Sequence, residues 1–289
     1  MGSTVTSGDV TAGRVRREPV VTAHQAASKV PQITVFFWII KILTTAQGEA
    51  TSDWLVYKID PFIAVAIGFV ALVVALALQF RARRYVAWVY WLTVDMVAIF
   101  GTMAADGMHI QLGIPYAVSS AFFAVVLAVV LVCWYVTERT LSIHSIRTRR
   151  REAFYWATVL STFALGTALG DMTATTLHLG YLTSGIMFTL IFAVPGVAHR
   201  WLRLNVIAAF WFAYIVTRPL GASYADWMGV PRSVGGLGFG RGPVAIGLTI
   251  PIIAFVAYLA ISRRDVEEPA ATPLAPRAPR SAGPGRHRS

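Results

Sequence analysis

The sequence predicts an all-α protein: a polytopic transmembrane bundle of eight helices, built from four tandem two-helix repeats in parallel orientation. Composition is the first reason, because the 289 residues are 56% hydrophobic and 13% charged, whereas soluble domains are about one-quarter charged. Apolar runs long enough to cross about 30 Å of hydrocarbon are the second. The third is a spaced motif that occurs four times.

The apolar runs place the membrane domain at residues 31–263, between basic ends at 1–30 and 264–289. Both ends are rich in Arg, Ala, Pro, Gly or Ser, so we expect disordered tails. Cys133 is the single cysteine, which excludes an intrachain disulfide. The eight spans are expected at 33–52, 61–80, 86–105, 115–137, 153–170, 183–199, 204–221 and 243–262.

Lysine and arginine are distributed unevenly over the two sides of these spans. Twenty of the 25 lie in the two tails and in the linkers that follow the second, fourth and sixth spans. Lys58, Arg232 and Arg241 are the three on the other side. Cytoplasmic loops carry the excess of Lys and Arg, so the distribution predicts that both termini are cytoplasmic. An even number of spans also puts both termini on one side.

A Trp is followed after ten residues by Gly and after another five by Asp, once in each odd-numbered span. Gly and the small residue before each Asp lie one helical turn apart, a spacing that lets helices approach closely. The Trp set is typical of interior packing or of an interfacial belt. The repeat units are 31–84, 85–150, 151–203 and 204–263. The motif residues are Trp38, Gly48 and Asp53; Trp91, Gly101 and Asp106; Trp156, Gly166 and Asp171; and Trp211, Gly221 and Asp226.

The repeats, with the segment "VPQITVFFWIIKILTTAQGEATSDWL", resemble a family of bacterial membrane proteins. That family is built from four tandem copies of a repeat of unknown function, each with two spans and a characteristic Trp. Its members are often labelled "membrane-anchored protein". The resemblance covers about residues 30–263 and implies the fold and a location in the bacterial cytoplasmic (inner) membrane. It implies no activity.

Six acidic residues lie within or at the ends of the odd-numbered spans, where a charge costs about 2.5–3.5 kcal/mol at mid-bilayer. Four of them are the repeat aspartates, which share one depth because all units have one orientation. They could surround a common axis near the outer face, as carboxylate rings do in cation pathways. Alternatively, each aspartate caps a helix or bonds to the following loop.

The other intramembrane charges occur in one unit each: Lys41, Glu49, Asp95 and Arg218. Lys41 and Asp95 lie three and four residues after their repeat Trp, while Arg218 and Glu49 lie seven and eleven residues after theirs. Each pair therefore shares a similar depth. The sequence predicts two buried ion pairs, Lys41–Asp95 and Arg218–Glu49, which serve either as structural supports or as a proton relay or gate.

These residues predict a transporter or permeation pathway for a small cation, a proton or a divalent metal. The cation or proton site is expected at Asp53, Asp106, Asp171, Asp226, Glu49 and Asp95, with Lys41 and Arg218 as coupling or ion-pair residues. The alternative is a non-transporting membrane sensor or scaffold. No catalytic constellation or cofactor fingerprint indicates an enzyme, and the expected partner is the lipid bilayer, not nucleic acid. A metal site that includes His109 or His178 is only weakly indicated.

Overall fold

The computed structural model describes residues 28–202 and 205–266, so the predicted tails lie almost entirely outside the described residues. Within those ranges the chain is all-helical and has no strand. The predicted fold class is therefore confirmed. The eight α-helices are α1 (Val35–Lys58), α2 (Pro61–Arg81), α3 (Ala87–Asp106), α4 (Tyr116–Glu138), α5 (Arg149–Asp171), α6 (Tyr181–Leu202), α7 (Val206–Gly229) and α8 (Arg241–Ser262).

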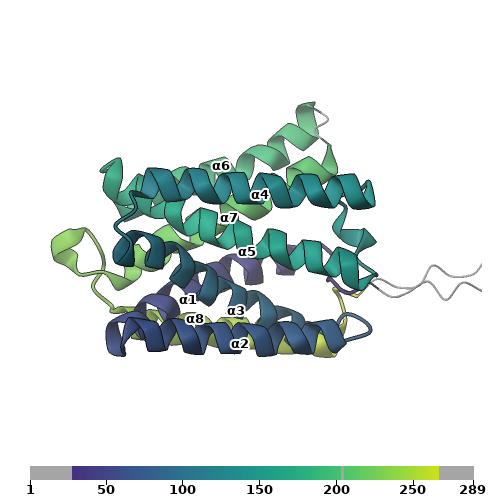
Figure 1. Cartoon of the computed structure of the whole chain (residues 1–289), viewed down its shortest axis with the longest axis horizontal. Coiled ribbons are helices and arrows are strands. Elements are labelled where there is room, and N and C mark those ends of the chain that lie inside the picture. The colour runs from purple at the N-terminus through teal and green to yellow at the C-terminus, as the bar shows by residue number, and fades with distance from the viewer. Residues whose placement is uncertain (1–27, 203–204, 267–289) are drawn as a thin grey trace, which may run out of the picture.

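The four odd-numbered helices form an inner ring, in which α1 contacts α3, α3 contacts α5, α5 contacts α7, and α7 returns to α1. Each even-numbered helix packs outside this ring, chiefly against the next odd helix along the chain, and α8 closes the circle on α1 (Figure 1). The even helices bury little of their surface. They form the apolar exterior, as a lipid-facing layer does.

Seven of the eight described helices are long and apolar enough to span a membrane. The exception is α1, which carries Lys41, Glu49 and Asp53 and turns these side chains into the bundle. The odd helices also end later in the chain than the sequence predicts, so each repeat aspartate lies within its helix or is its last residue. After Asp106 and Asp171 the helices continue as the π-helical turns η1 (Gly107–Gln111) and η3 (Met172–Thr176).

The inward face of the ring is a stack of five layers, each with one residue from every repeat. Successive layers are four residues apart along each helix, or about 6 Å. All members of the first four layers are buried. From the end of the bundle that holds the described termini, the layers are Phe37, Tyr90, Tyr155 and Phe210; Lys41, Val94, Val159 and Tyr214; Thr45, Ala98, Phe163 and Arg218; Glu49, Thr102, Thr167 and Ala222; and Asp53, Asp106, Asp171 and Asp226.

The repeat glycines set the spacing of the inner ring. A Cβ on Gly48 would lie 2.3 Å from the Ala98 Cβ, and one on Gly221 would lie 2.0 Å from the Thr45 Oγ1. Equivalent Cβ atoms on Gly101 and Gly166 would meet Phe163 and Arg218. Each glycine thus faces the same layer position on the next odd helix. The close approach expected from the Gly-x3-small spacing is present at every interface of the ring.

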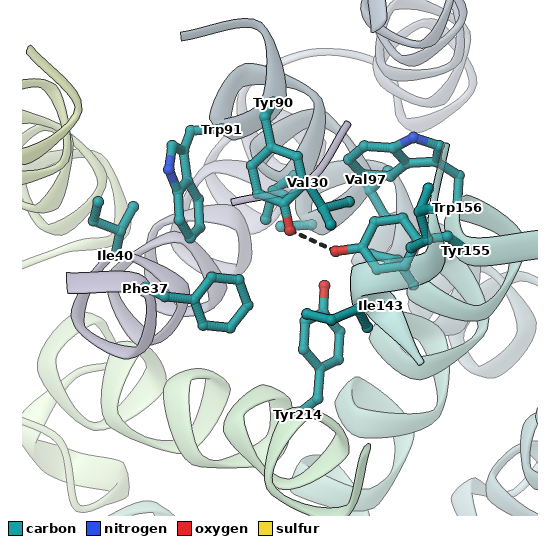
Figure 2. Packing of buried hydrophobic residues seen from close by; sticks show 14 of the residues in the cluster. Val30, Phe37, Ile40, Tyr90, Trp91, Val97, Ile143, Tyr155, Trp156 and Tyr214 are labelled. Carbon is teal, nitrogen blue, oxygen red and sulfur yellow. Dashed lines mark hydrogen bonds between the residues drawn. The ribbon is translucent and has the colours of Figure 1, made fainter. Parts of the chain in front are cut away.

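The repeat tryptophans pack inside the bundle and do not form an interfacial belt. Trp91, Trp156 and Trp211 are buried, and the partly buried Trp38 packs against the same aromatic cluster. Figure 2 shows the rings of the first layers converging, with the Tyr90 and Tyr155 hydroxyls joined by a 2.5 Å hydrogen bond. These aromatic side chains fill the axis of the ring near the end that holds the termini.

That end is further closed by the segment before α1. Val30 belongs to the main hydrophobic core, and Lys29 Nζ forms a buried 2.5 Å ion pair with Glu152 Oε2. Gln79 donates a hydrogen bond of 3.0 Å to the same carboxylate. The predicted tail 1–30 therefore extends too far, because Lys29 and Val30 are part of the packed domain.

Candidate functional site

The carboxylates of all four repeats meet at the end of the ring opposite the termini. One carboxylate oxygen each of Glu49, Asp171 and Asp226 lie within 4.8 Å of one another, and the same holds for Glu49, Asp53 and Asp106. The five residues Glu49, Asp53, Asp106, Asp171 and Asp226 are called the acidic cluster below. Glu49 is 2% exposed, and the four aspartates around it are half-buried. The geometry predicted for the repeat aspartates is present.

Two guanidinium groups contact the acidic cluster. Arg241, at the start of α8, donates from Nε to Asp53 Oδ2 at 2.6 Å. Arg218, from α7, donates from its Nη2 to Glu49 Oε2 at 2.5 Å, so the predicted Arg218–Glu49 ion pair is also present. Against five carboxylates these two cations leave an excess of three negative charges when every group is ionised.

Arg218 is held by a buried polar layer directly below the aspartates. Its Nη1 donates to the Thr45 carbonyl oxygen at 2.9 Å, and its Nη2 donates to the Thr167 hydroxyl at 2.7 Å and also contacts the Thr102 hydroxyl. Thr102 in turn donates to Glu49 Oε2 at 3.1 Å. Glu49, Thr102 and Thr167 occupy equivalent positions in three repeats. One arginine therefore joins α7 to the other three inner helices.

Lys41 lies two layers below Glu49 and is 1% exposed. Its Nζ has no hydrogen-bond partner among the described residues. Instead it lies over two aromatic rings, 3.9 Å from the Phe163 centroid and 4.2 Å from the Tyr214 centroid, where the ring faces attract a cation. Lys41 and Arg218 thus occupy two successive layers on the axis beneath the acidic cluster.

Asp95 does not lie on this axis, and the predicted Lys41–Asp95 ion pair is wrong. Asp95 lines a cavity between α3 and α8, and its Oδ1 has no hydrogen-bond partner among the described residues. The two residues share a depth but differ by one position in the repeat, and consecutive helical residues point about 100° apart. Lys41 consequently faces the axis, whereas Asp95 faces the neighbouring outer helix.

This geometry predicts that Lys41→Met and Asp95→Leu act independently on stability. In a double-mutant cycle, measured by unfolding the purified protein in detergent, we expect a coupling energy below about 0.5 kcal/mol. A coupling energy of several times that size, with the double variant more stable than the single changes predict, would restore the ion pair and contradict the structure.

Some residues of the site are not part of the repeat motif, so the motif alone does not predict them. Thr102 and Thr167 become recognisable only when the repeats are aligned on Trp and the position of Glu49 is read in each copy. Arg241 follows a Gly-rich loop and contacts Asp53 from an outer helix. His109 stacks on Tyr116 and bonds through Nδ1 to the Ile114 carbonyl oxygen at 2.8 Å, so it is engaged within its own loop.

The acidic cluster has the chemistry of a site for a hard cation. Oxygen ligands bind Ca²⁺ at about 2.3–2.6 Å, so two oxygens on opposite sides of one ion are about 4.6–5.2 Å apart. The oxygen separations within each group of three satisfy this limit. Carboxylates are suitable ligands for Mg²⁺, Ca²⁺ and Mn²⁺. Glu49 belongs to both groups, so it could coordinate two ions at once or a single ion that moves between the groups.

A family model described as Repeat of Unknown Function (DUF347) matches the chain four times in tandem, at residues 36–85, 89–140, 154–204 and 209–265. Each match covers most of one odd helix and all of the even helix that follows it. No curated protein and no solved structure matches the chain. The four matches span most of a multi-pass helical membrane protein, and the chain belongs to the Repeat of Unknown Function (DUF347) family.

Proposed function

We propose that the acidic cluster binds a small cation, foremost a divalent metal ion, and that the protein transports this ion across the bacterial cytoplasmic membrane. One observation carries the proposal: five carboxylates from four repeats lie around a common point, with two guanidinium partners among the described residues. Buried like charges repel unless a counter-ion or a bound proton neutralises them. A divalent cation would remove most of the excess negative charge.

The axis beneath the cluster favours a carrier over an open channel. Arg218 and Lys41 fill the second and third layers below the aspartates, and the aromatic layer follows. A cation could not pass the fixed positive charge of Arg218 in this conformation. The proposed transport cycle therefore requires a rearrangement in which Arg218 moves relative to Glu49, so that Arg218 acts as the gate. With cytoplasmic termini, as the distribution of Lys and Arg predicts, the cluster is accessible from outside.

Asp→Asn variants of the repeat aspartates test the proposal, with Mn²⁺ uptake into proteoliposomes as the measurement. Asp106→Asn, Asp171→Asn and Asp226→Asn should each reduce uptake by about tenfold or more, because each removes a charged ligand. Asp53→Asn should have a smaller effect, because Arg241 already neutralises that carboxylate. Asp60→Asn is the matched control, since Asp60 is an exposed N-cap of α2 and Asn preserves the cap.

Wild-type uptake that persists in all of the repeat variants would contradict the proposal. If the wild type carries no Mn²⁺ but conducts protons, and the same variants abolish that current, then the cation is a proton. Protons could be shared among the closely spaced carboxylates.

The alternative function is a membrane sensor or scaffold that transports nothing. The observation in its favour is that both Arg218 Nη atoms donate hydrogen bonds to neighbouring inner helices, as a structural cross-link does. That function predicts that proteoliposomes show no cation flux of any kind, while the repeat Asp→Asn variants change stability alone.

A further inference from the structure

A second polar site lies apart from the acidic cluster, in a cavity of about 450 Å³ between α3 and α8. Most of its walls are apolar or aromatic, and include Trp88, Trp91, Leu92, Ile252 and Val256. Small-molecule sites have about this size and character. Trp88 and Leu92 on its rim belong to the exposed surface of the bundle, so the cavity opens sideways at the depth of the membrane spans.

Two polar atoms at this cavity lack partners among the described residues. They are Asp95 Oδ1 and Gln47 Oε1, and both are buried. Both residues line the cavity, together with Trp91. Figure 2 shows the Trp91 nitrogen pointing away from the tyrosine hydroxyls on the axis. A buried polar atom without a partner costs stability, and an unpaired carboxylate costs more.

The repeat indicates that Asp95 is not needed to build the fold. Residues four positions after the repeat Trp in the other units are Ile42, Leu160 and Ile215. An aliphatic side chain therefore suffices at this position in three inner helices of the same ring. Since the Lys41–Asp95 pair is absent, no cation among the described residues forms a salt bridge with Asp95. The Asp95 carboxylate is therefore available to a ligand that is not part of the chain.

We propose that this cavity binds a lipophilic amine, meaning a protonated amino group on an apolar body, which enters from the bilayer. The ammonium group would donate hydrogen bonds to Asp95 and Gln47, and the indole faces of Trp88 and Trp91 would favour the positive charge. The aliphatic residues of α8 would cover the apolar body. A metal ion fits poorly because the cavity offers one carboxylate, and a neutral lipid chain would leave that carboxylate unpaired.

The test uses the purified full chain in lipid nanodiscs and a photoactivatable long-chain primary amine. Dodecylamine should compete with the labelling of α3 and α8, whereas dodecanol, which has the same chain but no charge, should not. Asp95→Asn should weaken labelling by about tenfold or more, because it removes the charged partner and keeps the shape. Asp60→Asn, which removes an exposed carboxylate elsewhere, should leave it unchanged.

Two results would overturn the proposal: equal competition by the amine and the alcohol, or undiminished labelling of Asp95→Asn. The first comparison uses the wild type alone, so the test stands even if the variant fails to fold. The outcome is independent of the acidic cluster, because Asp95 belongs to neither group of its carboxylates and lines a separate cavity.

Discussion

Arg218→Met should destabilise the protein by about 3–5 kcal/mol, the range found when one partner of a buried ion pair is removed. Arg218 is fully buried, and its loss leaves the 2%-exposed Glu49 without a cation. It also removes the hydrogen bonds that Arg218 donates to the Thr45 carbonyl oxygen and to the Thr167 hydroxyl. The four inner helices would lose their common cross-link. The measurement is the free energy of unfolding of the purified protein in detergent.

Two further variants separate the charge effect from a general loss of packing. Arg241→Met breaks a partly exposed ion pair with Asp53 and should cost only about 1 kcal/mol or less. Adding Glu49→Gln to Arg218→Met removes the unpaired carboxylate and should recover part of the stability. If Arg218→Met is no worse than Arg241→Met, the buried network does not stabilise the ring.

Gly221→Ala should also cause a large loss of stability, although it adds a single methyl group. The new Cβ would lie 2.0 Å from the Thr45 Oγ1 and 2.9 Å from the Ala46 backbone nitrogen. Backbone cannot yield as a flexible side chain does, so α1 and α7 must separate. Overpacking of this kind costs about 1–3 kcal/mol, and here it also disturbs the Arg218 hydrogen bond to Thr45.

Gly247→Ala is the matched control for this substitution. Gly247 lies in α8, and a Cβ there would meet no atom within 4 Å. Alanine is the better helix former by about 1 kcal/mol, so this variant should be as stable as the wild type or more so. Thermal unfolding of both variants checks the expectation. Equal behaviour of the two alanine variants would contradict the close contacts of the inner ring.

The sequence predicted the fold and much of the acidic cluster because both follow from repetition. Four copies of one spacing in one orientation place the four aspartates at one depth, and the Gly-x3-small pattern requires close helix contacts. The Arg218–Glu49 pair could be predicted for a related reason. Its residues lie seven and eleven positions after their Trp, in the same row of inward positions.

For other residues, the depth in the membrane was not enough to predict which side chains meet. Lys41 and Asp95 lie at nearly the same level, yet one residue of difference rotates Asp95 away from the axis by about 100°. Arg241 could not be predicted as a partner of Asp53. The motif does not indicate which outer helix packs against which inner helix. In the structure, α8 packs on α1, the first helix of the chain, and this closure brings Arg241 to Asp53.

The central claim is that the carboxylates of the four repeats jointly hold one cation-binding space. An anomalous difference map from crystals of the full chain grown with Mn²⁺ tests it most directly. We expect a peak coordinated by Glu49 together with repeat aspartates, and we expect no such peak in crystals of the Asp106→Asn, Asp171→Asn double variant. A wild-type map with no peak among these carboxylates, or with Mn²⁺ bound only elsewhere on the protein, would contradict it.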